Sequence, residues 1–272
     1  MKISFIGGGN MAAAMVGGMV SQGFKGNEIH IVEPDADKRS ELARQFGVSV
    51  GAPDDVLPAS TAVIFAVKPQ QLRPIASTLA PQLADTLVIS IAAGVRADTL
   101  SKWLGGLDRI VRVMPNTPAL VQAGISGAFA SAGATADDKA LAERILDSIG
   151  ETVWVNEEGD IDGVTAISGS GPAYVFYFME SLQAAARAQG FEPETARKLA
   201  YQTFAGAIKL ALQSDDDAAT LRQKVTSKGG TTERAINALE NSQVRSTIIA
   251  AASAAAARSR ELGDELGRDT QE

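Results

Sequence analysis

The chain of 272 residues is long enough for one large domain or two ordinary ones, and its 45% hydrophobic and 21% charged residues exclude a disordered polymer. A formal net charge of −7 excludes an overall basic field that would recruit nucleic acid or an anionic membrane, so anionic ligands must be held locally. Because the chain has no cysteine, disulfides, thiolate metal sites and cysteine nucleophiles are excluded as well.

The first half of the chain alternates short runs of β-branched residues with amphipathic stretches. The predicted strands are residues 2–6, 28–33, 62–66, 86–91, 109–114 and 152–155. The predicted helices are residues 11–22, 37–46, 70–83, 97–104 and 136–149. Such alternation is typical of strand–helix–strand crossovers, so we expect a parallel sheet with helices on both faces.

After about residue 165 the strand signals disappear and helix-forming residues dominate. Pro172 and Pro193 suit the first turns of two long helices. Three further helices are predicted after Asp217, from Thr231 and over residues 244–266. The second half is therefore expected to be entirely helical.

These elements predict an α/β fold in two domains. We expect a Rossmann-type, doubly wound sheet over residues 1–160 and an all-α helical domain over residues 161–272. A small bundle of apolar helices often buries its remaining surface against a second subunit, and small residues crowd the last helix. We therefore expect a homodimer or a larger homo-oligomer.

A glycine-rich turn links the first predicted strand to the first predicted helix. The sequence Gly7-Gly-Gly-Asn-Met-Ala12 fits the pattern G-x-G-x-x-A. In this pattern Gly7 permits a tight turn, Gly9 lets the backbone approach a pyrophosphate, and Ala12 is small enough for the helix to pack on the strand. Free amides at the positive end of the helix dipole then hold the phosphates. The segment therefore predicts binding of a dinucleotide.

Glu33 ends the second predicted strand, where an acidic side chain hydrogen-bonds the 2′-hydroxyl of the adenosine ribose. This position favours NADH, because a carboxylate repels a 2′-phosphate. Lys38 and Arg39 open the following helix, from where either could reach a 2′-phosphate. The sequence leaves the choice between NADH and NADPH open.

An obvious proton donor for the reduction of a carbonyl group is missing. The only histidine, His30, lies in the middle of a predicted strand, and no tyrosine has a lysine four residues further on. The turn Ser168-Gly-Ser-Gly-Pro172 resembles the one that opens the substrate helix of β-hydroxyacid dehydrogenases, but the lysine that follows it in those enzymes is absent. A substrate that already carries its proton, such as a cyclic iminium ion, is therefore favoured.

Six segments together resemble the pyrroline-5-carboxylate reductase family over nearly the whole chain. They are Phe5-Ile-Gly-Gly-Gly-Asn-Met11, Ala66-Val-Lys-Pro69, Ser90-Ile-Ala-Ala-Gly94, Arg112-Val-Met-Pro-Asn-Thr-Pro118, Ser168-Gly-Ser-Gly-Pro-Ala-Tyr174 and Val225-Thr-Ser-Lys-Gly-Gly-Thr-Thr232. The resemblance implies a Rossmann domain followed by a helical domain that dimerises, with dimers often assembling further. It also implies reduction of 1-pyrroline-5-carboxylate to L-proline by NADPH or NADH.

The resemblance also implies which residues form the site. Together with Glu33 from the strand pattern, the cofactor-binding residues are Ile6, Gly7, Gly8, Gly9, Asn10, Met11, Glu33, Ala66, Val67, Lys68, Pro69, Asn116 and Thr117. The substrate-binding residues are Ser227, Gly230, Thr231 and Thr232. This segment precedes a predicted helix, so its amides and hydroxyls suit a carboxylate, and Thr232 could act as the catalytic residue by hydrogen-bonding the ring nitrogen. The alternative interpretation of Thr232 is an ordinary N-cap residue.

Three positions depart from the family pattern. Lys228 stands where the family more often has proline, and it either adds a charge near the substrate carboxylate or faces solvent. The acidic run Asp215-Asp-Asp217 falls where the family often carries a glutamate near the site, and it either caps a helix or serves the partner subunit. Glu33 stands where some members have Ser or Asn.

Three alternative functions stay open: a reductase of another cyclic imine, a β-hydroxyacid dehydrogenase, and a non-catalytic NADP-sensing regulator. The missing lysine speaks against the second, and the intact segment 227–232 argues against the third. We expect a small-molecule substrate, with no metal site and no nucleic-acid partner. No membrane span or signal peptide is recognised in the sequence, which favours a cytoplasmic protein.

Overall fold

The computed structural model describes residues 1–268 of the chain. These residues form two compact units: one consists of Met1–Ser170 together with residues 254–268, and the other is Gly171–Ser253. The division falls inside the last helix, α11 (Val244–Arg268), so its two halves belong to different units. Within the described residues, no helix is both long enough and apolar enough to cross a membrane.

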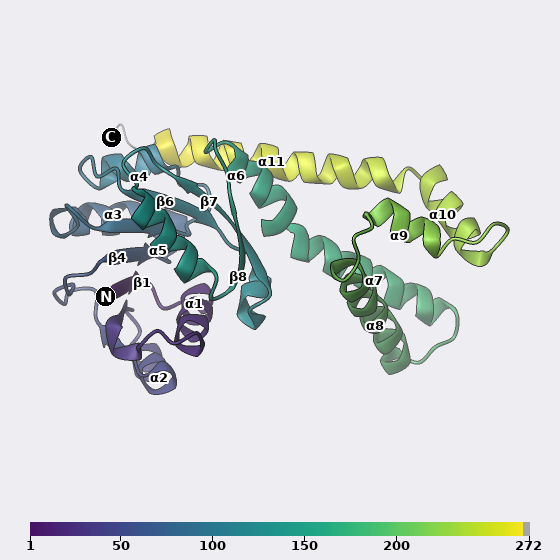
Figure 1. The fold of residues 1–272 in the computed structure, drawn as a ribbon, viewed down its shortest axis with the longest axis horizontal. Helices are drawn as coiled ribbons and strands as arrows, with labels where there is room; N and C mark the ends of the chain where they lie inside the picture. The colour runs from purple at the N-terminus through teal and green to yellow at the C-terminus, as the bar shows by residue number, and fades with distance from the viewer. Residues whose placement is uncertain (269–272) are drawn as a thin grey trace. The chain divides into compact units, whose positions relative to one another are not determined.

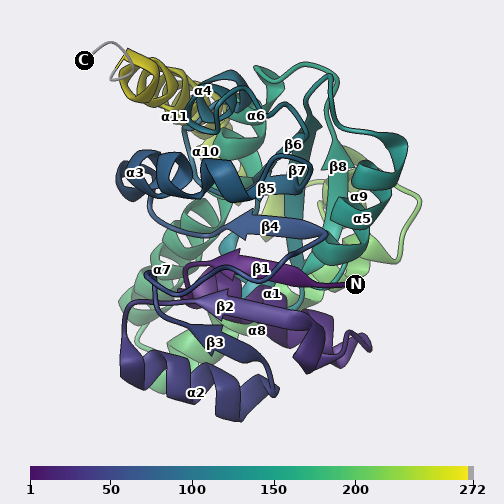
Figure 2. The ribbon, with the colours of Figure 1, turned by 90° about the vertical axis from the view of Figure 1, so that its left-hand side faces the viewer.

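The described part of the first unit contains an eight-stranded sheet (Figures 1 and 2). Its strands are β1 (Ile3–Ile6), β2 (Ile29–Val32), β3 (Ser49–Gly51), β4 (Ala62–Phe65), β5 (Leu87–Ser90), β6 (Ile110–Met114), β7 (Gly124–Ala130) and β8 (Gly150–Trp154). Their order is β3-β2-β1-β4-β5-β6-β7-β8. The neighbours from β3 to β6 are parallel, whereas β7 runs antiparallel to β6. The Rossmann-type fold is confirmed, but the expectation of an entirely parallel sheet is wrong at β7.

Strands β3 and β7 were not predicted from the sequence, for different reasons. β3 has only three residues, which is too short for a periodic pattern. β7 contains Gly124 and Gly127, and glycine disfavours strands. At Gly127 the glycine is needed for packing, because an added Cβ would lie 2.5 Å from the Val164 side chain.

Helices cover both faces of the sheet. On one face lie α1 (Asn10–Ser21), α2 (Ala36–Phe46) and α5 (Ala136–Leu146). On the other face lie α3 (Pro69–Leu79) and α4 (Ala97–Trp103). The central strand β4 serves both layers: Ala62 and Ile64 pack in the first cluster, while Val63 and Phe65 pack in the second. Because both faces are covered, this strand is apolar throughout.

Short helical segments fill several connections of the first unit. They are the 3₁₀ turns η1 (Gly26–Glu28), η2 (Ala80–Gln82) and η3 (Thr117–Val121), the short helix α6 (Asp160–Val164) and the π-helical turn η4 (Thr165–Gly169). The buried carboxylate of Asp162 in α6 accepts a hydrogen bond of 2.5 Å from Ser259 of α11. This bond ties the C-terminal half of α11 to the sheet domain.

The second unit is helical, as expected (Figure 1). It contains α7 (Gly171–Ala188), α8 (Pro193–Leu212), α9 (Ala218–Lys224), α10 (Thr231–Asn241) and the first half of α11. Pro193 is the first residue of α8, where its missing amide hydrogen costs nothing. Gly190 follows α7 at φ +90°, a left-handed conformation that glycine adopts without strain.

An ion pair between the buried carboxylate of Asp138 and the partly exposed guanidinium of Arg109 joins the start of β6 to the start of α5. Asp138 is 4% exposed and accepts hydrogen bonds from the Arg109 guanidinium at 2.7 and 3.2 Å and from the Thr135 amide at 2.9 Å. Thr135 caps the helix in return by accepting from the Asp138 amide at 3.1 Å. Burial raises the pKa of the Asp138 carboxyl, but the hydrogen bonds from Arg109 and Thr135 outweigh it, so the pKa lies below its ordinary value.

We expect Asp138→Asn to lower the free energy of unfolding by about 2 kcal/mol, because it removes the charge-assisted hydrogen bonds between Arg109 and a buried carboxylate. Because folding lowers the pKa of Asp138, this stabilisation is complete above the unfolded pKa and is lost as the pH falls through the folded one. Urea unfolding at neutral and acid pH measures both effects. Asp137→Asn, an exposed neighbour in the same first turn, is the matched control. An equal loss in that control would contradict the assignment.

Candidate functional site

The turn between β1 and α1 is held tightly against two neighbouring strands. Gly7 lies at φ +102°, where other residues are strained. Its amide donates to the Val32 carbonyl at 2.8 Å, and an added Cβ would lie 2.7 Å from the Ala66 carbonyl oxygen. Glycine is therefore required here by backbone conformation and by space.

Gly9 leaves an open space at the N-terminus of α1. It is the N-cap residue, no side chain caps this helix, and an added Cβ would meet no atom within 4 Å. The first intrahelical bond runs from the Ala13 amide to the Gly9 carbonyl at 2.9 Å, so the amides of Asn10, Met11 and Ala12 have no acceptor within the helix. Free amides at the positive end of a helix dipole suit a phosphate, so this open cradle fits a dinucleotide's pyrophosphate.

Glu33 lies directly after β2 and is fixed by two backbone amides. One carboxylate oxygen accepts from Gly8 at 2.9 Å and the other from Asp35 at 3.1 Å. The residue is 7% exposed. Its carboxylate is therefore held beside the glycine loop. Each oxygen keeps a further lone pair that can accept a hydrogen bond.

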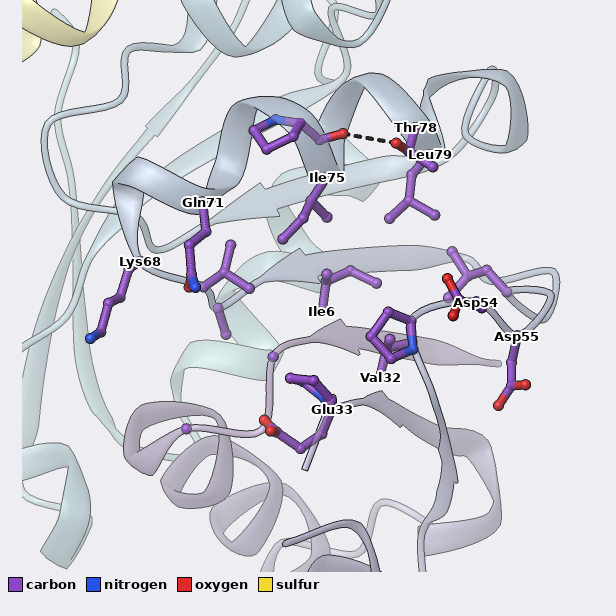
Figure 3. A pocket seen from close by; sticks show the side chains of 18 of the residues that line it. Ile6, Val32, Glu33, Asp54, Asp55, Lys68, Gln71, Ile75, Thr78 and Leu79 are labelled. Atoms are coloured by element: carbon purple, nitrogen blue, oxygen red, sulfur yellow. Dashed lines mark hydrogen bonds between the residues drawn. The ribbon is translucent and has the colours of Figure 1, made fainter. Parts of the chain in front are cut away.

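A cavity of about 530 Å³ opens where β1, β2 and β4 end (Figure 3). Its apolar lining includes Ile6, Val32, Leu57, Ile75 and Leu79, and its charged lining consists of Glu33, Lys38, Asp54, Asp55 and Lys68. In Figure 3 the side chains of Ile6, Val32 and Ile75 lie together between α3 and the sheet, and the Glu33 carboxylate lies at the glycine-loop end. An apolar slot with a few fixed polar groups is typical of a nucleotide subsite at the carboxyl edge of a parallel sheet.

The structure brings only part of the proposed cofactor site to this cavity. The expected residues that line it are Ile6, Gly7, Gly9, Glu33, Ala66, Val67 and Lys68. Gly8, Asn10 and Met11 lie in the same loop and first helical turn, and Pro69 is the first residue of α3, but none of them lines the cavity. Asn116 and Thr117 follow β6, further along the same edge of the sheet.

The side chain of Asn116 is fully engaged within the protein. Its oxygen accepts from the Ile125 amide at 3.0 Å and its nitrogen donates to the Ser168 carbonyl at 3.1 Å. Asn116 is 8% exposed and thus braces β7 and the π-helical turn η4. A contact of this segment with a cofactor therefore rests on its backbone and on the exposed Thr117.

Sequence reasoning missed one wall of the cavity. Gln71, Ile75 and Leu79 stand four residues apart on α3 and all line it, as does Thr78. That spacing places side chains on one helix face, so the signal was present in the sequence. The loop residues 53–55 gave no such signal, because they follow the unpredicted strand β3.

The second predicted segment lies at the start of α10. The helix begins at Thr231 with Gly230 as its N-cap, so Thr232 is the second helical residue. The alternative reading of Thr232 as an N-cap residue is therefore wrong. In the described structure the hydroxyl groups of Ser227, Thr231 and Thr232 have no hydrogen-bond partner, which leaves them available to a ligand.

Two amides of this turn are already used. The Gly230 amide donates to the Ser227 carbonyl at 3.0 Å, and the Gly229 amide donates to the Glu233 carboxylate at 2.7 Å. Gly229 adopts φ +74°, so the turn needs glycine there. The groups that remain for an anion are the hydroxyls and the first-turn amides of α10.

The acidic run before α9 has a structural role in the chain. Asp217 caps α9 by accepting from the Thr220 amide at 2.7 Å, and this bond holds the pKa of its carboxyl below the ordinary value. Asp216 pairs with Lys224. The interpretation of the acidic run as a helix cap therefore holds for Asp217. Lys228, the other departure from the family pattern in this region, is exposed to solvent.

His30 does not belong to the candidate site. It lies in β2, its Nδ1 is 3.0 Å from the Ser49 hydroxyl, and it does not line the large cavity. Burial lowers its pKa, which favours the neutral ring at physiological pH. These contacts agree with the structural role that its place in the strand indicated.

Two family models match the chain. Residues 158–262 match the model described as pyrroline-5-carboxylate reductase dimerisation. Residues 2–94 match the model described as NADP oxidoreductase, coenzyme F420-dependent. Together the two matches cover most of both compact units.

Curated relatives and solved structures match over almost the full length. The pyrroline-5-carboxylate reductase of Pseudomonas aeruginosa is 40% identical over 269 residues, which are 98% of this chain and 98% of the relative. A solved pyrroline-5-carboxylate reductase from Coxiella burnetii is 43% identical with a TM-score of 0.91, covering 96% of this chain and 98% of that chain. The Plasmodium falciparum enzyme, solved with NADP bound, is 29% identical with a TM-score of 0.85, covering 97% and 98%.

Proposed function

This chain belongs to the pyrroline-5-carboxylate reductase family, and we propose that it reduces 1-pyrroline-5-carboxylate to L-proline with NADH or NADPH. The observation that carries the proposal is the open cradle at Gly9, next to the free amides of α1 and the cavity at the carboxyl ends of β1, β2 and β4. A dinucleotide needs this combination of a free helix N-terminus and an adjoining apolar slot.

We propose that Ile6 to Met11 hold the pyrophosphate and that Glu33, Ala66, Val67, Lys68 and Pro69 border the adenosine ribose and nicotinamide. Asn116 and Thr117 complete this proposed set through the segment that follows β6. When bound, the reduced nicotinamide supplies the hydride. The surroundings of Gly7 and Gly9 support these assignments: the fold requires glycine at position 7, and Gly9 leaves room for a ligand.

The substrate is assigned to the turn before α10. The hydroxyls of Ser227 and Thr231 and the first-turn amides would hold its carboxylate, with Gly230 giving the turn its shape. Thr232 would hydrogen-bond the ring nitrogen and orient the C=N bond. A protonated imine needs no further proton donor, so positioning and exclusion of water supply most of the rate enhancement.

We further propose that the first 160 residues bind the cofactor and that residues 161–272 carry the substrate-binding and dimerisation functions, with residues 161–170 and 254–268 of that stretch packing in the sheet unit. Large apolar side chains on the helical unit support a homodimer: Phe176 is 64% exposed, Tyr177 68%, Ile208 58% and Leu212 82%. Side chains of this size are rarely left in water over a whole face. Assembly of dimers into a larger homo-oligomer, a cytoplasmic location and the absence of a nucleic-acid partner belong to the same proposal.

The assay that tests the function follows oxidation of NADH and of NADPH with 1-pyrroline-5-carboxylate and measures the proline formed. Turnover with one or both cofactors is expected. If neither cofactor is oxidised although both bind, the proposed reaction is wrong. Turnover with a six-membered cyclic imine at a higher kcat/KM would instead favour the related imine reductase.

We expect Thr232→Ala to lower kcat/KM for 1-pyrroline-5-carboxylate about 10- to 100-fold, because a hydrogen bond to a charged group contributes roughly 1.5–3 kcal/mol. The Kd for the cofactor should change less than about twofold, since Thr232 belongs to the substrate segment. Steady-state kinetics and cofactor titration separate the two effects. Thr203→Ala on α8, where the hydroxyl bonds only the Leu199 carbonyl, is the matched control. A comparable loss of cofactor binding in Thr232→Ala would contradict its assigned role.

A further inference from the structure

NADH and NADPH differ only in a 2′-phosphate on the adenosine ribose. The residues around Glu33 bear on which of the two cofactors fits this site. The inference rests on the proposed cofactor site. Three observations within the first unit bear on the choice: the placement of Glu33, the capping of α2, and the direction of Arg39. Each concerns a different group of atoms.

The carboxylate of Glu33 lies beside the glycine loop, at the strand end where dinucleotide-binding folds hold the 2′ position of the adenosine ribose. Its oxygens accept from the amides of Gly8 and Asp35 at 2.9 and 3.1 Å, so the side chain cannot turn away without losing one buried and one partly buried hydrogen bond. A fixed carboxylate accepts hydrogen bonds from ribose hydroxyls and repels a phosphate.

The N-terminus of α2 begins shortly after Glu33 and is an alternative anchor for a phosphate, but two of its amides are already used. Asp35 accepts from the amides of Asp37 at 2.9 Å and Lys38 at 3.1 Å. The chain's own carboxylate thus takes the amides that a 2′-phosphate would use.

Arg39 is the strongest candidate for a phosphate-binding cation, but its guanidinium is turned onto the backbone. It donates to the carbonyls of Glu33 at 2.6 Å and Pro34 at 2.9 Å. Of the described charged residues that line the cavity, three are acidic (Glu33, Asp54 and Asp55) and two are basic (Lys38 and Lys68). The cavity therefore carries more negative than positive charge.

We propose that this cavity selects the cofactor without the 2′-phosphate, so that NADH is the preferred reductant and Glu33 is the residue that sets the preference. Glu33 accepts hydrogen bonds from the 2′- and 3′-hydroxyls of the ribose. Lys38 alone does not reverse the selection, because the neighbouring carboxylates offset its charge.

The test measures binding of the adenine halves by calorimetry, with ADP-ribose and 2′-phospho-ADP-ribose as probes. The wild type should bind ADP-ribose at least about tenfold more tightly, a ratio that corresponds to ~1.4 kcal/mol. Glu33→Ser should shift this ratio at least about tenfold toward the phosphorylated probe. Glu33→Gln keeps an acceptor for the Gly8 amide, removes the repulsion and should shift the ratio in the same direction.

Asp37→Asn is the matched control, because it removes one exposed negative charge from the same helix end without touching the cavity. Its ratio should stay at the wild-type value. Equal or tighter binding of 2′-phospho-ADP-ribose by the wild type overturns the proposal, as does an unchanged ratio in both Glu33 variants. Turnover with NADPH preferred would refute this inference and leave the reductase function intact. Selective binding of ADP-ribose without any turnover would support this inference and contradict the proposed reductase function.

Discussion

Gly9→Ala is expected to weaken binding of the cofactor about 30- to 100-fold, equivalent to ~2–3 kcal/mol, while the protein without cofactor stays folded. A methyl group at this position meets no protein atom within 4 Å, so the fold has room for it. The same methyl group would stand between the α1 amides and a pyrophosphate, and the lost approach of backbone to phosphate is the cause of the weaker binding.

The backbone of Gly9 also permits the substitution. Its φ of −69° and ψ of 179° are extended values that any residue adopts. Alanine is a poorer N-cap than glycine, but it also reduces the entropy of the unfolded chain, and the two effects offset each other within about 1 kcal/mol. The thermal midpoint of the cofactor-free variant should therefore move by no more than about 4 °C.

Gly9→Ser and Gly7→Ala complete the experiment. Serine is a good N-cap, so Gly9→Ser should hold or raise the thermal midpoint and still weaken cofactor binding. Gly7→Ala should instead destabilise the fold, because Gly7 lies at φ +102° and an added Cβ would be 2.7 Å from the Ala66 carbonyl oxygen. Calorimetric titration with NADH and thermal unfolding measure the two properties. Undiminished binding in both Gly9 variants would show that the pyrophosphate does not lie on this loop.

The fold was predictable wherever the chain marks its own element boundaries. Pro193 is the first residue of α8 and Asp217 directly precedes α9, so the starts of these helices were predicted to within about two residues. β7 could not be predicted, because the glycine at position 127 is required by close packing against Val164, which lies 37 positions away in the sequence. Local pattern carries no information about such a contact.

The candidate site was predictable to the same degree. The glycine loop and Glu33 follow from their places at two strand ends, and that part of the cavity was anticipated. The bracing role of Asn116 was not, because its amide joins Ile125 to Ser168, which lie 9 and 52 residues away. A motif indicates that a residue is needed at a position, while its hydrogen-bond partners decide what it is needed for.

Gly18 shows that local sequence pattern also fails to predict the effect of a substitution on stability. It lies in the middle of α1, where glycine costs about 1 kcal/mol relative to alanine. The helix pattern alone would therefore suggest that Gly18→Ala is stabilising. An added Cβ would lie 2.0 Å from the Ser148 carbonyl oxygen and 2.9 Å from its carbon, which are backbone atoms that cannot rotate away.

We therefore expect Gly18→Ala to lower the free energy of unfolding by about 3 kcal/mol, since overpacking at a backbone contact outweighs the gain in helix propensity. The Ser148 hydroxyl also bonds the Ile145 carbonyl at 2.6 Å, so this turn is fixed and has little freedom to retreat. For a domain of this size the loss corresponds to a thermal midpoint lower by roughly 10 °C.

Gly17→Ala is the matched control, one residue away in the same helix. There an added Cβ would lie 3.0 Å from the edge of the Phe46 ring, which is a partly exposed side chain and can shift. We expect Gly17→Ala to change the thermal midpoint by less than about 3 °C, because the gain in helix propensity offsets the small rearrangement of the ring. Thermal unfolding of both variants without cofactor compares the two contacts directly. Equal stability of the two variants would mean that α1 can move away from Ser148, and that the close approach is not what fixes glycine at position 18.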